Sequence, residues 1–365
     1  MNRSTLSRIV AMPAATAIAL GLAACGPANE QGGGSSESGL SGTINGAGAS
    51  SQEAAQQAWI AGFTSENPDV TINYDPIGSG GGREQFVAGG TDFGGTDAYL
   101  DDKELAGAKK RCGELVEIPA YVSPVAVIFN LEGVDELNLK PDTIAKIFNQ
   151  KITKWNDPAI KADNPEAELP DTKITPVNRS DESGTTENFV EYLSAAAGDA
   201  WPHEVSGNWP VSGGEAAQGT SGVVQAVKAG NGTIGYADAS QAGDLSTAKV
   251  GVGGDFVEYS PEAAAAVLDV SERVEGRGEY SFAFDLARDT KEAGTYPIVL
   301  VSYALACAQY EDAETAELVK SYLSYMISEE GQQTAAENAG SAPISDSLRE
   351  KVTPAIDAIS AGGQS

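Results

Sequence analysis

Three segments rich in Gly, Ser and Thr each join a predicted strand to a predicted helix. They are residues 46–51 (GAGASS), 78–82 (GSGGG) and 183–186 (SGTT). The first backbone N–H groups of a helix lack intrahelical partners and carry a partial positive charge, and glycine lets an oxyanion approach them closely. Ser and Thr hydroxyls add donors without adding charge. These residue types therefore favour the binding of a small anion.

Each segment alone is more simply explained as an ordinary turn followed by a helix N-cap. Arg179 stands four residues before Ser183, and a guanidinium beside a helix N-terminus can surround a tetrahedral anion with donors. Three such segments together with Arg179 indicate one oxyanion site, in which Arg179, Ser183, Gly184 and Thr185 take part.

Nucleotide binding is disfavoured, because no Gly-Lys-Ser or Gly-Lys-Thr follows the glycines. Residues 46–51 also lack the third glycine of a dinucleotide-binding fingerprint; Asp75 stands near the place of its acidic residue, so this alternative stays open. The formal net charge of −29 excludes nucleic acid as a partner, because such an acidic surface repels a phosphate backbone. A small anion is still compatible with that charge, since local donors act at short range and salt screens charges beyond about 8 Å.

An enzyme, such as a secreted phosphatase, is the main alternative class. A Ser-His-Asp system would have to use His203, the single histidine of the sequence, which is more simply a loop-packing residue. One histidine also excludes a histidine-based metal cluster. The neighbouring Asp101 and Asp102 are more simply charges at the start of a helix than an acid–base pair. We therefore predict no catalytic residue, no metal and no cofactor.

The N-terminus has the features of an export signal. Arg3 and Arg8 precede an uncharged apolar run, residues 9–24, that is too short to span a bilayer stably. The run ends in Leu-Ala-Ala-Cys at Cys25, which resembles the lipobox of bacterial lipoproteins; an ordinary cleavage site is the alternative. We expect a signal peptide over 1–24, and a lipidated Cys25 with a flexible tether over 25–39. The protein would then lie at the extracytoplasmic face of the cell membrane, held by lipid only.

With Cys25 assigned to lipid, Cys112 and Cys307 are the remaining cysteines. In an exported protein, two remaining cysteines favour one disulfide. A pair of buried free thiols is the alternative, because separation along the sequence does not fix a distance in space.

Strand-like segments alternate with helical ones, which predicts an α/β fold with a mostly parallel sheet. The predicted strands are residues 40–46, 70–74, 91–95, 121–129, 173–177, 233–236 and 297–307. The predicted helices are residues 51–65, a segment ending at 87, 143–148, 185–193, 220–228, 313–327, 329–338 and 345–359. The length of 365 residues is enough for two domains with their own cores.

Six motifs, in their order along the chain, carry a family resemblance. They are GAGAS (46–50), IGSGGG (77–82), DFGGTDA (92–98), IAKIFNQKITKWND (144–157), RSDESGT (179–185) and GTIGYA (232–237). Together they closely resemble the PstS family, the phosphate-binding proteins of high-affinity phosphate ABC importers. The resemblance implies a protein that captures inorganic phosphate and delivers it to the permease subunits of the importer. We expect a monomer.

The resemblance also implies the periplasmic-binding-protein-like fold of type II, with two lobes, two crossover strands and ligand in the interlobe cleft. The crossings should lie near residues 119–124 and 296–302. Residues 40–121 with 297–365 would then form lobe I, and residues 122–296 lobe II. Cys112 and Cys307 fall in or beside lobe I, which makes their pairing more plausible.

The family's ligand contacts fall on matching positions of this sequence. These are Ser50, the backbone of Ser51, Ser79, Asp97, Arg179, Ser183, Gly184 and Thr185. The Asp97 carboxylate can accept the proton of hydrogen phosphate but meets only lone pairs on sulfate, so it implies selectivity. Asp181 is expected to orient Arg179 by a salt bridge, with a solvated turn residue as the alternative. A binding protein for phosphonate or arsenate stays open as an alternative function.

Two positions depart from the family pattern. Ser51 stands where many relatives have an aromatic residue, although a backbone contact there does not depend on the side chain. Glu182 replaces the usual glycine of the RSDESGT motif. A positive φ at Glu182 would strain the turn, and its charge would then weaken anion binding.

Overall fold

The computed structural model describes residues 39–362, and these residues fold around one large mixed sheet. Within them the strand order is β2-β1-β3-β13-β4-β8-β6-β7, while β9 pairs with β4, β5 and β10. The strands of this sheet are β1 (Gly42–Gly48), β2 (Val70–Asp75), β3 (Phe93–Thr96), β4 (Leu115–Asn130), β5 (Leu137–Leu139), β6 (Thr175–Arg179), β7 (Glu215–Ala217), β8 (Thr233–Asp238), β9 (Ser246–Val252), β10 (Asp255–Val257) and β13 (Val299–Cys307).

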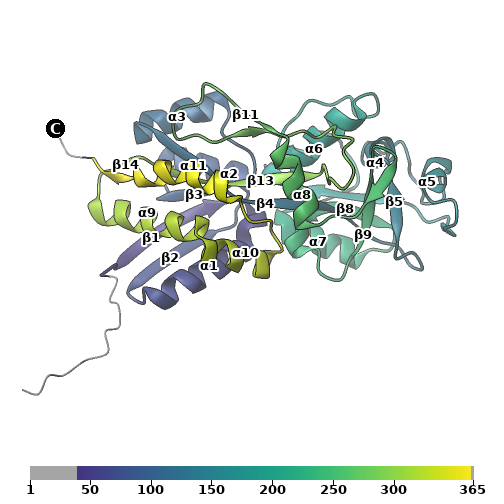
Figure 1. Cartoon of the computed structure of the whole chain (residues 1–365). Coiled ribbons are helices and arrows are strands. Elements are labelled where there is room, and N and C mark those ends of the chain that lie inside the picture. Colours follow the sequence, from purple (N-terminus) through teal and green to yellow (C-terminus); the bar gives the residue numbers. More distant parts are fainter. Residues whose placement is uncertain (1–38, 363–365) are drawn as a thin grey trace, which may run out of the picture. The chain divides into compact units, whose positions relative to one another are not determined.

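The long strand β4 joins the two parts of the sheet. It pairs antiparallel with β13 from Leu115 to Pro124 and with β8 from Val125 to Asn130. This change of partner divides the sheet between two lobes (Figure 1). We call the lobe built on β1, β2, β3 and β13 the first lobe, and the lobe built on β6, β7, β8 and β9 the second lobe.

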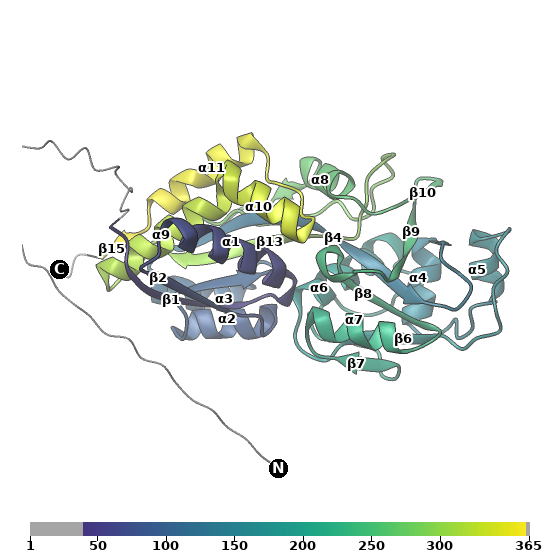
Figure 2. The same cartoon turned by 90° about the horizontal axis from the view of Figure 1, so that it is seen from below.

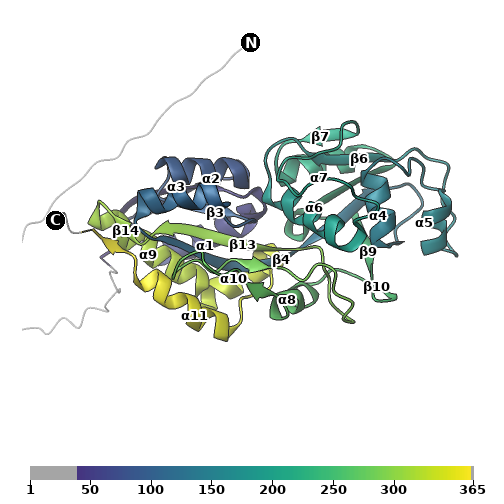
Figure 3. The same cartoon turned by 90° about the horizontal axis from the view of Figure 1, so that it is seen from above.

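Helices cover both faces of the sheet in each lobe. In the first lobe α2 and α3 lie on one face, and α1, α9 and α10 on the other (Figures 2 and 3). In the second lobe α7 lies on one face, and α4 and α6 on the other (Figure 1). The helices are η1 (Ser50–Gln52), α1 (Glu53–Glu66), α2 (Ser79–Ala88), α3 (Asp102–Cys112), α4 (Pro141–Phe148), α5 (Pro158–Asp163), α6 (Gly184–Ala197), α7 (Gly219–Ala229), η2 (Ala239–Gln241), α8 (Pro261–Asp269), α9 (Ala313–Ile327), α10 (Glu329–Ala339) and α11 (Asp346–Asp357).

The predicted strands and helices are confirmed, most of them with small shifts of their ends, although β4 begins at Leu115, well before the predicted start at 121. The expectation of a mostly parallel sheet is wrong. β4 pairs antiparallel with β13 and with β8, and β13 pairs antiparallel with β3. The reason is that β4 and β13 cross between the lobes in opposite directions. Parallel pairing is confined within the lobes, as between β1 and β2 or between β6 and β8.

Helix α3 was not predicted from the sequence, although the sequence indicates Asp101 as a charge at a helix start. The Asp101 carboxylate accepts from the Glu104 N–H at 2.7 Å, and the Glu104 carboxylate accepts from the Asp101 N–H at 2.9 Å. This capping box satisfies two backbone donors at the first turn. It explains why a segment with few apolar residues nevertheless forms a helix.

A hairpin of β11 (Glu272–Arg273) and β12 (Phe284–Asp285) contacts the first lobe. The main chain of Glu117 on β4 bonds to Tyr280 and Phe282 at 3.0 and 2.8 Å. The buried Glu117 carboxylate also pairs with Arg277 at 3.0 Å. The hairpin is therefore fastened to the first part of β4, because a buried carboxylate needs a partner of this kind.

Cys112, at the end of α3, and Cys307, at the end of β13, form a disulfide with a Cα–Cα distance of 4.6 Å. Two further short strands, β14 (Gln309–Tyr310) and β15 (Ser360–Ala361), pair beside it. No helix among the described residues has the length and apolarity to cross a membrane. The predicted signal peptide and Cys25 lie outside the described residues.

Candidate anion-binding site

The starts of four helices meet at one place between the lobes. They are η1 and α2 of the first lobe and α6 and α7 of the second. The Gly80 N–H in α2 donates to the carbonyl of Glu182, just before α6, at 3.3 Å. Helix N-termini carry partial positive charge and unpaired N–H groups. Their convergence provides a surface suited to an anion despite the acidic composition of the chain.

Asp97, which follows β3 and is 2% exposed, lies in the middle of this place. Its Oδ2 accepts from the Ser51 hydroxyl at 2.6 Å and from the Thr185 hydroxyl at 3.0 Å. The Asp97 N–H donates to Ser79 Oγ at 3.2 Å. Burial raises the pKa of Asp97 above its ordinary value, while hydrogen bonds from Ser51, Ser302 and Thr185 act against that rise. The structure thus brings Ser51, Ser79 and Thr185, from three predicted motifs, into contact with one residue, Asp97.

Arg179 lies at the end of β6 and is 3% exposed. Its Nε donates to Asp181 Oδ1 at 2.9 Å, and its Nη2 contacts Asp181 Oδ2. The Gly219 N–H at the start of α7 donates to the same Oδ1 at 3.0 Å. Burial by itself raises the pKa of Asp181, but the hydrogen bond and charge of Arg179 outweigh it, so the pKa lies below its ordinary value. Asp181 therefore stays charged and fixes the direction of the guanidinium.

Ser183 and Gly184 form the start of α6. The Ser183 hydroxyl accepts from the Thr186 N–H at 3.2 Å, which makes it the N-cap. Gly184 faces the first lobe so closely that an added Cβ would lie 2.7 Å from Ser79 Oγ and 2.8 Å from Asp97 Cβ. Only a glycine leaves space for the two lobes to approach at this point.

Thr220, at the start of α7, was not predicted from the sequence to be a site residue. Its hydroxyl lies 3.0 Å from Ser50 Oγ, and its N–H donates to the same oxygen at 3.1 Å. The Ser50 carbonyl accepts from Gln241 at 2.7 Å. The signal was present, because Gly219, Thr220 and Ser221 form another small and hydroxylated helix start.

Ser302 on β13 was missed as well. Its hydroxyl donates to Asp97 Oδ1 at 2.7 Å, and Gln52 Nε2 donates to Ser302 Oγ at 2.8 Å. In the sequence Ser302 stands alone within a nearly continuous apolar strand, 205 positions from Asp97. A buried Ser in such a strand was the only available signal.

His203 lies apart from these residues. Its ring nitrogen lies 3.1 Å from Asn149 Oδ1, and the ring packs edge-on against Trp201 at a centroid distance of 4.8 Å. Neither partner belongs to the predicted site. These contacts are those of a loop-packing residue, as the sequence analysis interpreted it.

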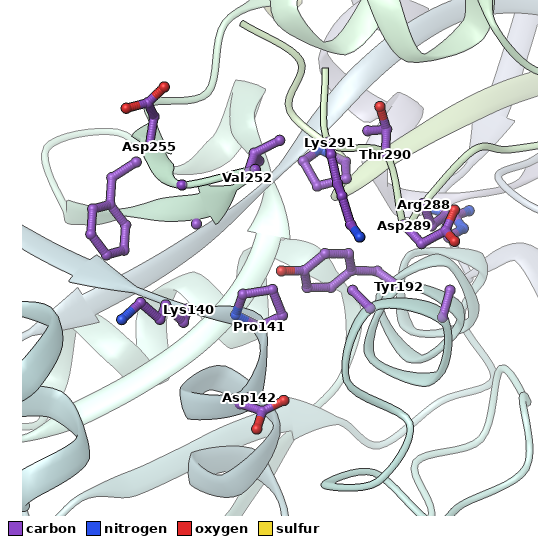
Figure 4. Close-up of a pocket in the computed structure, with 17 residues that line it drawn as sticks. Lys140, Pro141, Asp142, Tyr192, Val252, Asp255, Arg288, Asp289, Thr290 and Lys291 are labelled. Carbon is purple, nitrogen blue, oxygen red and sulfur yellow. The ribbon is translucent and has the colours of Figure 1, made fainter. Parts of the chain in front are cut away.

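A hollow of about 670 Å³ lies in the second lobe between α4, α6 and the turn from β9 to β10. Tyr192, Val252 and Lys291 border it (Figure 4). It shares no residue with the predicted anion site, so the two places are separate.

Comparison with known proteins places the chain in a family. A model of the PBP superfamily domain matches residues 33–330. The phosphate-binding protein PstS 3 of Mycobacterium leprae is 36% identical over 357 residues, which cover 93% of this chain and 95% of that protein. The chain belongs to the PstS family. PstS 3 of Mycobacterium tuberculosis strain H37Rv is 37% identical over 361 residues, with the same coverage of both chains.

The fold agrees with a solved structure of a high-affinity periplasmic phosphate-binding protein, PfluDING, bound with phosphate. That structure superposes with a TM-score of 0.70 at 22% identity and covers 86% of this chain and 93% of its own. The predicted two-lobed α/β fold of the PstS family is therefore confirmed. The family membership predicted from the motifs is confirmed too.

The structure explains how this PstS-family chain accommodates Glu182. Among the described residues Gln150 is the single non-glycine residue with a positive φ, so Glu182 does not strain the turn. Its carboxylate pairs with Arg83 at 3.0 Å, which offsets its charge. The other departure, Ser51, donates its hydroxyl to Asp97 at 2.6 Å, a bond that a Phe side chain could not make.

Proposed function

We propose that this chain binds inorganic phosphate, as hydrogen phosphate, in the cleft between its lobes and delivers it unchanged to the permease of an ABC importer. The position of Asp97 carries the proposal. Ionised Asp97 offers about four lone-pair positions, of which three hydroxyls use three. One position is left for a proton, and hydrogen phosphate has that proton where sulfate has none. The names of the PstS relatives support this ligand.

We further propose the roles of the predicted residues. Arg179, oriented by Asp181, would grip two phosphate oxygens, since a guanidinium binds oxyanions in a bidentate way. The N–H groups at the starts of η1, α2 and α6 would hold the others. The proposed contacts are Ser50, the Ser51 backbone, Ser79, Ser183, Gly184 and Thr185, and Thr220 would position Ser50.

We propose lobe boundaries at residues 40–121 with 297–365, and at 122–296. The change of pairing on β4 after Pro124 supports the first crossing, and the pairing of Val299 with Pro124 supports the second. Closure about these crossings would enclose phosphate, and opening would release it.

Export and anchoring are also proposals. Members of the PstS family act outside the cytoplasm, and the features of residues 1–24 support export. We propose that Cys25 carries the lipid, that the protein acts as a monomer, and that it contacts the membrane only through this anchor and the permease.

Calorimetric titration of the purified protein with phosphate, sulfate and arsenate tests the function. We expect saturable phosphate binding at micromolar concentration or below, and no sulfate binding under the same conditions. Absence of phosphate binding would contradict the proposal. Arsenate carries a comparable proton, so the ratio of the phosphate and arsenate affinities measures how far the selectivity depends on the size of the anion. Turnover of a generic phosphate ester, abolished by Ser79→Ala, would instead indicate an enzyme.

A further inference from the structure

A buried chain of polar side chains leads from α9 to Asp97. The Tyr322 hydroxyl donates to Gln56 Oε1 at 2.7 Å, and Gln56 Nε2 donates to Gln52 Oε1 at 2.9 Å. Gln52 Nε2 donates to Ser302 Oγ at 2.8 Å, and the Ser302 hydroxyl donates to Asp97 Oδ1 at 2.7 Å. All five side chains belong to residues that are at most 2% exposed. We call Tyr322, Gln56, Gln52 and Ser302 the polar chain.

The direction of the polar chain is fixed at Gln52. Gln52 Nε2 also donates to the main-chain carbonyl of Tyr303 at 3.0 Å. A carbonyl oxygen can only accept, so the NH₂ end of this amide must face Tyr303 and Ser302. Gln52 Oε1 then faces Gln56 and must accept from it, and the Gln56 oxygen must accept from Tyr322. Every donor along the chain therefore points toward Asp97.

The backbone of β13 places Ser302 for this role. The register between β13 and β4 shifts between Ser302 and Tyr303, and such bulges change the direction of a side chain locally. Pro119 lies opposite Tyr303 in this register and has no N–H to donate. The Tyr303 carbonyl accepts from Gln52, and the same amide reaches Ser302.

The hydrogen-bond directions along the polar chain determine where the single proton of the Ser302 hydroxyl points. Its oxygen accepts from Gln52 at 2.8 Å, so its hydrogen is committed to Asp97 Oδ1. Oδ2 already accepts from Ser51 and Thr185. Both oxygens of Asp97 therefore accept hydrogen bonds, an arrangement that favours the ionised carboxylate. An ionised Asp97 has no proton to donate to a fully deprotonated anion.

We infer that Gln52 and Ser302 are positioning residues that hold Asp97 as an acceptor and thereby make the site prefer a protonated oxyanion over a fully deprotonated one. This inference rests on the proposed function. It goes beyond it because neither residue belongs to the ligand contacts, and their effect passes through Asp97.

Other titratable groups also act on Asp97. Arg179 favours its ionised form, while Asp238 and the buried hydroxyls of Tyr74 and Tyr121 are the neighbours that share its surroundings. Burial raises the pKa of Asp97, and the Ser302 hydrogen bond lowers it. Loss of that bond should allow Asp97 to take up a proton at a higher pH and then to donate it to an anion.

The test compares the wild-type protein with Ser302→Ala and Gln52→Met in calorimetric titrations with phosphate and with sulfate. Both anions are titrated at several pH values between about pH 5 and pH 8, above the ordinary pKa of an Asp carboxyl. We expect Ser302→Ala to weaken phosphate binding about tenfold and to reduce the preference for phosphate over sulfate about tenfold or more, most strongly at low pH. Gln52→Met keeps the Ser302 hydroxyl but frees its rotation, so we expect a smaller change in the same direction.

Thr143→Val is the matched control. The Thr143 hydroxyl is buried and donates to Asp163 Oδ2 at 2.7 Å, a comparable bond in the second lobe and outside the anion site. Thr143→Val should lower the melting temperature and leave the anion preference unchanged. Tyr322→Phe removes the first donor of the polar chain and should change the preference less than Ser302→Ala.

The outcomes separate the inference from the proposed function. If the wild-type protein binds no phosphate, the proposed function fails first. If the wild-type protein prefers phosphate but both Ser302→Ala and Gln52→Met keep that preference at every pH, the positioning role is wrong and the function stands. Using Gln52→Met as well keeps the test decisive where one of the variants folds poorly.

Discussion

Arg83 on α2 and Glu182 before α6 form an ion pair of 3.0 Å between the two lobes. The Arg83 side chain is 6% exposed and is held in its own lobe by Glu104 at 2.9 Å. Its Nη1 also donates to Thr96 Oγ1 at 3.2 Å. Arg83 is therefore fixed before Glu182 arrives, so the entropy cost of forming the pair falls mainly on Glu182. The pair exists only when the lobes lie together.

Glu182→Gln should weaken phosphate binding by destabilising the closed arrangement. The Glu182 side chain is 46% exposed, so the ion pair is screened and worth at most about 1 kcal/mol, which corresponds to about fivefold in affinity. Calorimetry at low and high salt measures the effect, and the difference between the two proteins should shrink as salt rises. Tighter phosphate binding by Glu182→Gln would show that the charge of Glu182 repels the ligand more than it holds the lobes.

Gly184→Ala should obstruct closure without unfolding either lobe. The added methyl would lie 2.7 Å from Ser79 Oγ and 2.9 Å from the Ala98 nitrogen. Both contacts join residues of the two lobes, so the strain of about 1–3 kcal/mol applies where the lobes lie together. We expect phosphate affinity to fall about 5- to 160-fold with little change in the melting temperature of the ligand-free protein. Gly222→Ala in α7, where the nearest atom is at 3.5 Å, is the control and should bind normally.

Several elements of each lobe could be predicted from the sequence because local signals define them. Alternating apolar segments and small helix-start residues indicated β1, α2, β6 and α6 close to their observed bounds. The first part of β4 was missed because Glu117 and Pro119 interrupt its apolar pattern. Glu117 is tolerated there because Arg277, 160 positions away, pairs with it, and no local pattern indicates such a partner.

The same limit applies to the anion site. The motif residues around Arg179 and Asp97 could be named from the family resemblance. Gln52, Ser302 and Arg83 could not, because their roles depend on contacts with residues far away in the sequence. The bond from Ser302 to Asp97 spans 205 positions, and the bond from Arg83 to Glu182 spans 99. Only the arrangement of strands across both lobes reveals these pairs.

Replacing Cys112 and Cys307 by Ala should destabilise the protein but leave phosphate binding intact. The Cys112–Cys307 disulfide closes a loop with a sequence separation of 195 residues, which restricts the unfolded chain. A native disulfide of this kind contributes about 2–5 kcal/mol to the free energy of unfolding. Urea denaturation of the double variant measures this loss, and reductant should lower the stability of the wild-type protein alone. Phosphate affinity within about twofold of wild type, a change of about 0.4 kcal/mol, is expected because neither cysteine is among the proposed ligand contacts.

Asp238, at the end of β8, makes the stability of the protein depend on pH. Its Oδ1 accepts from the Ser240 N–H at 3.0 Å, and burial raises its pKa to about 7. In the unfolded chain a typical Asp titrates near about 3.9. Between these values the folded protein holds a proton that the unfolded chain has lost, so the contribution of this group to stability falls as pH rises and reaches its minimum above about pH 7.

Asp238→Asn removes this penalty. The variant should gain about 1–3 kcal/mol relative to the wild-type protein at pH 8, and the gain should shrink toward pH 5. Urea denaturation at several pH values measures the difference. Asp312→Asn is the control, because hydrogen bonds from Thr315 lower the pKa of Asp312. The stability difference between Asp312→Asn and the wild-type protein should therefore stay constant between about pH 5 and pH 8. A difference for Asp238→Asn that does not change with pH would mean that Asp238 stays ionised in the folded protein.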